Sequence, residues 1–220
     1  MPISPDILFF TVEIIGTIAF AISGAMTAIE RQLDLFGVLF LGATTAIGGG
    51  IFRDILLGQI PPQAFLNYVY MLTAVITAGV IFLLNFINSR RDTPLPFFST
   101  ELLNFFDAAG LGIFSVIGVQ NTINAGFGDN SFFCIFLGML TGVGGGMLRD
   151  IMSRTTPAVL RKHIYALASI AGSICYYYLH ALHDGAAILG TTVLVVVIRL
   201  LASHYKWTLP RIPLPDTSQI

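Results

Sequence analysis

Long apolar segments follow one another along almost the whole chain, separated by short polar stretches. Seven are long enough to cross a membrane, at residues 7–29, 35–57, 64–87, 102–123, 132–152, 159–179 and 181–201. A helix needs roughly 20 apolar residues to span a bilayer core of about 30 Å. The pattern therefore predicts an all-α integral membrane protein with seven transmembrane helices. The seventh is the weakest, because its uncharged part runs only from Gly185 to Ile198.

Composition supports this interpretation and excludes several functions. The chain is 55% hydrophobic and 10% charged, with a mean hydropathy of +0.82, which is far too apolar for a soluble domain. The net charge of −1 and the scattered basic residues provide no surface for nucleic acid. The start, "MPISPDILFF", is acidic before its apolar run and predicts a first membrane helix instead of a signal peptide. Cys134 and Cys175 lie in apolar runs, and we expect buried thiols there.

The positive charges predict how the chain is oriented. Lys and Arg in short loops stay on the cytoplasmic side of the membrane. Nine of the eleven follow the first, third, fifth and seventh helices: Arg31, Arg90, Arg91, Arg154, Arg161, Lys162, Arg199, Lys206 and Arg211. This distribution predicts an N-terminus outside the cell and a C-terminus in the cytoplasm. The two remaining basic residues are Arg53 and Arg149, which lie inside apolar segments.

The chain also contains an internal repeat. The segment "FLGATTAIGGGIFRDI" at residues 40–55 aligns with "FLGMLTGVGGGMLRDI" at residues 136–151, including the triple glycine and the Arg-Asp pair. The similarity extends to other positions, which pair Glu13 with Asp107, Gly16 with Gly110, Phe20 with Phe114, Gly24 with Gly118 and Pro61 with Pro157. Three helices per copy is an odd number, so the copies must be inverted. We expect repeats at residues 1–90 and 91–180, and a seventh helix with a tail at 181–220.

The triple glycines are the first candidate site. Three successive glycines cost roughly 1 kcal/mol each in helix propensity relative to alanine, which predicts a kink or an unwound turn. Freed backbone groups cannot face lipid, so they would line a path near the membrane centre. The alternative is close helix packing, which "GATTA" and "GMLTG" also suggest. The residues concerned are Gly48, Gly49, Gly50, Gly144, Gly145 and Gly146, with Thr45 and Thr141 as candidate hydroxyls, although threonine often bonds its own helix.

The two arginines are the second candidate site. Each lies about 10 Å from the membrane midplane at 1.5 Å per residue, where a charge must be paired or hydrated. The adjacent Asp54 and Asp150 point about 100° away from them on a helix, so we do not expect direct neutralisation.

Acidic residues on other helices are the expected partners of these arginines. Glu13 and Asp107 lie at similar depths to the arginines of their own repeats. We therefore predict the contacts Glu13–Arg53 and Asp107–Arg149. Such pairs either hold helices together or line a pathway and regulate the charge that passes along it.

No feature predicts an enzyme, a metal site or a cofactor. Neither glycine run continues as a phosphate-binding loop or a dinucleotide fingerprint, and no nucleophile stands with a base. His180 and His183 have helical ligand spacing, but no third ligand beyond Asp184 is apparent.

The paired "GGGIFRD" and "GGGMLRD", the three-plus-three-plus-one layout and the length resemble the prokaryotic branch of the trimeric intracellular cation (TRIC) channel family, over residues 7–205. The resemblance implies a homotrimer in a prokaryotic plasma membrane, each protomer having its own pore for monovalent cations, chiefly K⁺. It places the pore between the second and fifth helices, with Gly48–Gly50 and Arg53 on one wall and Gly144–Gly146 and Arg149 on the other.

The same pattern is similar to bacterial membrane proteins described as glycine transporters. A broken helix offers carbonyl groups to a cation, whereas a helix N-terminus beside an arginine suits a carboxylate, so a zwitterion would use both. A cation channel is the function we expect; a small amino-acid transporter and a non-conducting scaffold are the alternatives.

Overall fold

The computed structural model describes residues 5–90, 99–161, 164–181 and 184–207, and these ranges are helical throughout apart from their turns. The elements in chain order are α1 (Pro5–Glu30), α2 (Leu35–Leu56), α3 (Gln63–Leu66), α4 (Tyr68–Ser89), α5 (Thr100–Thr122), the π-helical turn η1 (Ile123–Phe127), α6 (Ser131–Met152), α7 (Ala158–Arg161), α8 (Ile164–Leu179) and α9 (Asp184–His204).

The predicted all-α membrane architecture is confirmed, with one difference in the lengths of the helices. Six described helices, α1, α2, α4, α5, α6 and α9, are long and apolar enough to cross a membrane. A further apolar helix, α8, is shorter, with 16 residues. The sequence had instead made the seventh segment, at residues 181–201, the weakest. The predicted span at residues 159–179 is divided between α7 and α8, and the span at 64–87 begins with the short α3 before α4.

Polar side chains fix the starts of several helices. Asp34, Asn67, Ser99 and Asn130 precede α2, α4, α5 and α6, and the side-chain oxygen of each accepts a hydrogen bond from a backbone N–H in the first turn. Such caps satisfy amide groups that have no partner within the helix. The short polar breaks in the hydrophobic pattern thus determine where each span begins.

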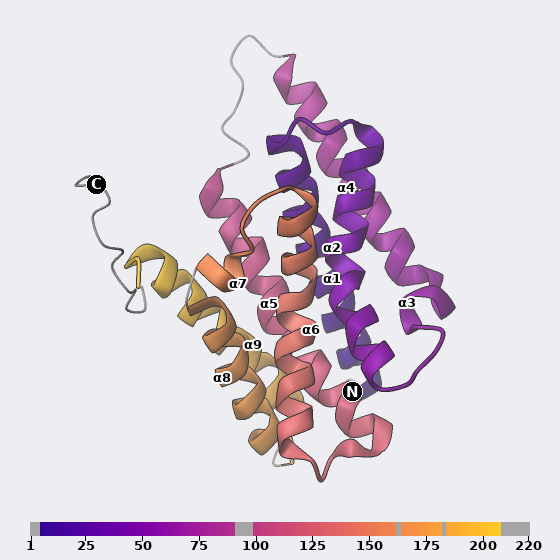
Figure 1. The fold of residues 1–220 in the computed structure, drawn as a ribbon, viewed down its shortest axis with the longest axis vertical. Helices are drawn as coiled ribbons and strands as arrows, with labels where there is room; N and C mark the ends of the chain where they lie inside the picture. Colours follow the sequence, from indigo (N-terminus) through magenta and orange to yellow (C-terminus); the bar gives the residue numbers. More distant parts are fainter. Residues whose placement is uncertain (1–4, 91–98, 162–163, 182–183, 208–220) are drawn as a thin grey trace, which may run out of the picture.

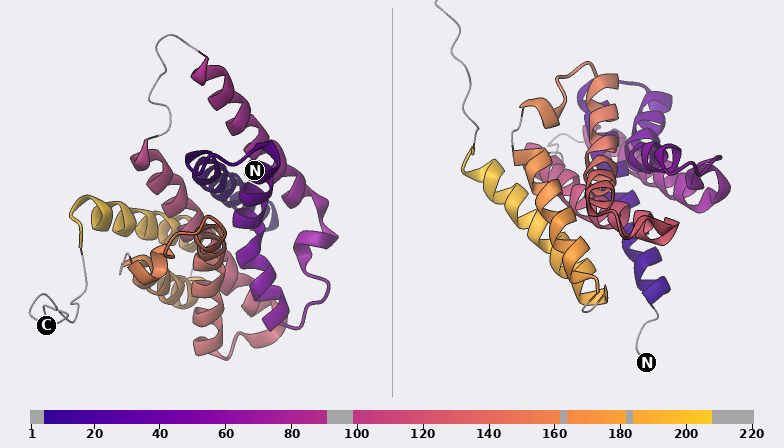
Figure 2. Two further views of the ribbon diagram at one scale, coloured as in Figure 1. Left: turned by 45° about the horizontal axis from the view of Figure 1, so that its top comes forward. Right: turned by 60° about the horizontal axis from the view of Figure 1, so that its bottom comes forward.

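Four helices form the centre of the bundle. α1, α2, α5 and α6 pack against one another, α4 packs against α1 and α2, and α8 and α9 pack against α5 (Figure 1). Figure 2 shows α8 and α9 on the opposite flank from α4. α5 is the most enclosed, with every side chain from Gly110 to Val119 buried. By contrast, α4 buries only Ala74 and Ala78, as expected of a helix at the periphery.

The arrangement of the two halves is consistent with the inverted repeat. Each half consists of two long helices followed by a third preceded by a short helical turn. In Figure 1 the N-terminus and the turn between α5 and α6 lie at the same end of the bundle, so α1 and α5 run in opposite directions. The equivalent residues Phe20 and Phe114 meet between the halves, with ring centroids 5.2 Å apart. The exact division at residues 90 and 180 stays a prediction.

The triple glycines do not unwind their helices. Both α2 and α6 continue as α-helix through the three glycines, so the predicted unwound turn is wrong, and a kink stays a prediction. Close packing explains the central glycine of each run. A Cβ atom on Gly49 would overlap the backbone carbonyl oxygen of Thr141, and one on Gly145 would overlap that of Thr45. The two helices therefore cross with their backbones in contact.

Substitution at this crossing tests its importance for stability. Gly49→Ala and Gly145→Ala force backbone against backbone, where no flexible side chain can yield. We expect each to lower stability by about 1–3 kcal/mol, the usual cost of overpacking, measured as thermal unfolding of the purified protein in detergent. Gly190→Ala is the matched control, because a Cβ there meets nothing within 4 Å. Equal stability of all three variants would contradict the crossing.

Candidate functional site

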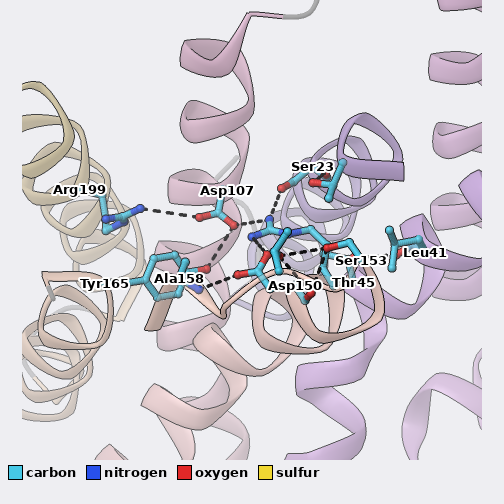
Figure 3. A network of polar contacts seen from close by, with 12 residues as sticks. Ser23, Leu41, Thr45, Asp107, Asp150, Ser153, Ala158, Tyr165 and Arg199 are labelled. Atoms are coloured by element: carbon cyan, nitrogen blue, oxygen red, sulfur yellow. Dashed lines mark hydrogen bonds and ion pairs between the residues drawn. The ribbon is translucent and has the colours of Figure 1, made fainter. Parts of the chain in front are cut away.

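The second repeat holds a buried cluster of charges, which we name the Asp107 site: Asp107, Arg149, Asp150 and Tyr165. Arg149 Nη1 donates to Asp107 Oδ1 over 2.6 Å, which confirms the predicted contact. Tyr165 donates its hydroxyl to the same oxygen over 3.2 Å, and Arg149 Nη1 also donates to the hydroxyl of Ser23 on α1. Figure 3 shows this network between α5, α6 and the neighbouring helices. Both partners of the ion pair are almost completely buried.

Each arginine also binds the aspartate that follows it in the sequence. Arg149 Nε and Nη2 lie 2.9 and 2.8 Å from Asp150 Oδ1, and Arg53 Nε and Nη2 lie 2.8 and 2.7 Å from Asp54 Oδ1. The expectation that neighbouring residues do not neutralise each other is therefore wrong. The arginine side chain is long enough to fold back, and burial makes an unpaired guanidinium far more costly than the bent conformation.

Both aspartates have a second structural task. The remaining oxygen of Asp54 accepts a hydrogen bond from the backbone N–H of Gln63 over 2.8 Å, and that of Asp150 accepts one from Ala158 over 2.7 Å. These N–H groups start α3 and α7, the short turns that precede the third helix of each repeat. The Arg-Asp pair thus connects the end of α2 to α3 in the first half and the end of α6 to α7 in the second.

The first repeat holds the equivalent group, which we name the Glu13 site: Glu13, Arg53, Asp54 and Tyr70. Tyr70 donates its hydroxyl to Glu13 Oε2 over 2.6 Å, as Tyr165 does to Asp107. The predicted Glu13–Arg53 ion pair does not form, because the guanidinium group turns to Asp54 and the Glu13 carboxylate turns to Tyr70. Glu13 and Arg53 instead face the same cavity from two sides.

That cavity has a volume of about 350 Å³, and both polar and apolar side chains, Phe9 and Phe10 among the latter, line it. Besides the charges of the Glu13 site, side-chain amides surround it, from Gln59, Gln63, Asn67, Asn121 and Asn124. A narrower recess continues from the Glu13 site past Thr17 and Gly50 to Phe114. Gly50 lies open to this space, since a Cβ there would approach only Arg53 Nη2, at 3.8 Å. The cavity is therefore large enough for water, ions or a small solute.

An aromatic pair separates the recess from the Asp107 site. Phe114 lines the recess and stacks on Phe20, which is 1% exposed and lies against Gly110 and Gly145. One turn beyond Phe20 on α1, Ser23 already contacts Arg149. The pair thus lies between two charged regions, the Glu13 site and the Asp107 site.

The other predicted residues have packing roles. The hydroxyls of Thr45 and Thr141 donate to carbonyl groups of their own helices, at Leu41 and Leu137, both over 2.6 Å. A Cβ on Gly48 would meet the side chain of Leu148.

The third glycines differ from these. Gly50 faces the recess, and Gly146 faces Tyr165 and Asp107. The first and the third glycine of each run thus have different surroundings.

The structure adds residues that the sequence analysis did not assign to the site. Tyr70 and Tyr165 make the same kind of hydrogen bond in the two halves. The offset that aligns the two motifs places Tyr70 opposite Ala166, so the sequence repeat did not indicate this pair. Arg199 of α9 was assigned to the cytoplasmic end, but it is 3% exposed, with Nη2 3.8 Å from Asp107 Oδ2. His183 and the side chain of Asp184 lie outside the described residues; among the residues described, no three His, Cys, Asp or Glu side chains form a metal site.

Comparison with known proteins identifies relatives along almost the whole chain. The profile of a family described as glycine transporter matches residues 10–85 and 104–181, in two parts that suggest an internal repeat. UPF0126 membrane protein of Deinococcus radiodurans is 39% identical over 208 residues, covering 93% of this chain and 92% of its own length. UPF0126 inner membrane protein YadS of Escherichia coli is 37% identical over 216 residues, covering 96% and 100%.

Solved structures agree with this relationship. A structure reported under the description "Structural basis for conductance through TRIC cation channels" is 34% identical, with a TM-score of 0.79, and covers 95% of this chain and 99% of that one. A prokaryotic TRIC channel crystallised in 0.5 M KCl is 31% identical, with a TM-score of 0.80, and covers 93% and 100%.

The helices and the relatives define the class of this protein: it is a multi-pass inner-membrane protein. It is of the channel type and not an enzyme. The chain belongs to the prokaryotic TRIC channel family, and UPF0126 membrane proteins are among its relatives.

The Arg-Asp pairs give a prediction on stability. Asp150→Asn removes a charge from Arg149 and weakens the bond to the α7 turn, so we expect a loss of about 3 kcal/mol or more, as for other broken buried ion pairs. Asp129→Asn, at an exposed position between η1 and α6, is the control and should change little. Thermal unfolding in detergent measures both. A stable Asp150→Asn protein would show that this pair is dispensable to the fold.

Proposed function

We propose that this protein is a channel for monovalent cations, chiefly K⁺, with a pathway in each protomer between α2 and α6. The observation that carries the proposal is the similarity to TRIC cation channels along the whole chain, combined with a polar cavity that ends on buried charges. One related structure is the trimeric intracellular cation channel orthologue from Rhodobacter sphaeroides, 26% identical with a TM-score of 0.79, which supports a homotrimer here.

The proposed pathway begins in the cavity and continues along the faces of α2 and α6 that carry the third glycines. It passes Arg53, Gly50 and the Phe20–Phe114 pair, then Gly146 and Arg149. The first two glycines of each run hold the two helices together beside it. Distribution of basic residues supports an N-terminus outside the cell, so the cavity opens outward and the Asp107 site faces the cytoplasm.

Electrostatics at the Glu13 site favour a cation. Glu13 and Asp54 carry two negative charges against the one positive charge of Arg53, a net charge of −1 for these three side chains. Arg53 is bound to Asp54 through two nitrogen atoms, so its charge does not stand alone in the cavity. Carboxylate and amide oxygens such as those that line this cavity attract cations and can replace part of their hydration shell.

The same cavity supports one alternative, a transporter for a small zwitterion such as glycine. Its lining combines the guanidinium group of Arg53 with the carboxylate of Glu13, and the family profile is described as glycine transporter. However, Arg53 already uses Nε and Nη2 for Asp54, which leaves it less able to bind a substrate carboxylate in the two-pronged way that favours recognition.

Reconstitution into liposomes distinguishes the two functions. We expect K⁺ flux with single-channel steps in planar bilayers and no saturable uptake of labelled glycine. Glu13→Gln should reduce K⁺ conductance several-fold at low ionic strength and less at high ionic strength, because salt screens the lost attraction. Glu30→Gln, at an exposed helix end, is the control. Saturable glycine uptake without channel steps would replace the proposed function by the alternative.

A further inference from the structure

Arg199 is a buried cation beside the Asp107 site, and among the described residues no second buried arginine accompanies Arg53 at the Glu13 site. It comes from α9, which lies outside the two repeats and packs against α5 and α8. Its position is fixed by close contacts one turn earlier, where Val195 is fully buried and a Cβ on Gly112 would come within 2.9 Å of the Thr192 carbonyl oxygen. α9 follows the second repeat, whereas in the described part of the chain the next helix after α4 of the first repeat is α5.

The guanidinium group of Arg199 is held without a hydrogen bond to Asp107. Nη2 lies 3.8 Å from Asp107 Oδ2, beyond hydrogen-bond range, and the group lies over the Tyr165 ring at 4.5 Å. Its Nε has no hydrogen-bond partner among the described residues, although it is buried. Figure 3 shows Asp107 between Arg199 on one side and Ser23 and Asp150 on the other.

The two carboxylate oxygens of Asp107 consequently differ. Oδ1 accepts hydrogen bonds from Arg149 and Tyr165. Oδ2 faces the guanidinium group of Arg199, whose Nη2 lies 3.8 Å away, too far for a hydrogen bond. A cation that bound at this oxygen would take the place of the guanidinium group beside it, because the two positive charges repel each other.

Charge balance gives the arrangement its effect. The Asp107 site by itself has the two negative charges of Asp107 and Asp150 against the one positive charge of Arg149; Arg199 beside it brings the formal net charge of these four side chains to zero. The Glu13 site carries −1. Removing Arg199 would give the second site the charge of the first.

We propose that Asp107 Oδ2 is a binding position for a permeating monovalent cation. In the closed state the guanidinium group of Arg199 occupies this position in place of the permeating cation. Arg199 thereby limits the rate and selectivity of conduction, and the seventh helix brings this control into an otherwise two-fold architecture. This inference rests on the proposed cation pathway.

Planar-bilayer recordings of purified, reconstituted protein test the proposal. Arg199→Gln should raise K⁺ current several-fold and raise the permeability ratio of K⁺ over Cl⁻, since a positive charge leaves the pathway. Arg199→Lys keeps the charge and should return the current toward the wild-type level. Arg154→Gln removes an exposed charge just after α6 and controls for surface potential.

The double variant Arg199→Gln/Asp107→Asn separates the proposed site from a loosened helix. It should lose the added current, because the cation-binding oxygen has gone; a gain that persists there, or one with reduced cation selectivity, would show that α9 had merely come loose and would overturn the proposal. Wild-type current with no gain in Arg199→Gln would also overturn it. Absence of cation current in the wild type would overturn the proposed function itself, and this inference with it. Thermal unfolding and elution as an oligomer verify that each variant is folded.

Discussion

The backbones of α2 and α6 touch where Gly49 and Gly145 meet, and the other features of the protein are arranged around this contact. Any side chain there would strike a carbonyl group of the opposite helix. Because the helices cross so closely, the Arg-Asp pairs that follow one turn later are brought into the interior of the bundle. Buried arginines then require partners, and their partners determine how the chain returns into α3 and α7.

The two halves use the same parts with different results. In each, a tyrosine hydroxyl binds an acidic residue of the first helix, and an arginine binds its neighbouring aspartate. The shorter Asp107 reaches Arg149 and forms a closed network, whereas Glu13 turns to Tyr70 and leaves a cavity beside Arg53. One pseudo-symmetric design thus gives an open vestibule on one side and a sealed, electrically neutral cluster on the other.

Much of this could be predicted from the sequence, because it follows from composition and recurrence. Hydrophobic segment length predicted the membrane helices, and the repeated "GGGxxRD" motif predicted a shared site with the Asp107–Arg149 contact. The contacts that failed depend on side-chain geometry. The angle between successive residues of a helix predicts that Arg53 and Asp54 point apart, yet the long arginine side chain folds back to its neighbour. The burial of Arg199 follows from how α9 packs against α5 and could not be predicted from the sequence. Helix propensity led to the expected kink or unwound turn, whereas the alternative of close packing, which the small-residue motifs also suggested, explains the central glycine of each run.

We propose that the pathway runs beside the glycine crossing and that the stacked rings of Phe20 and Phe114 close it. Single-channel recording of Phe114→Ala tests this claim most directly, with Phe132→Ala as control, since Phe132 is 78% exposed. A smaller side chain at the barrier should raise the open probability for K⁺ well above that of the wild type, while the control behaves as the wild type does. A folded Phe114→Ala protein with unchanged open probability would contradict the account.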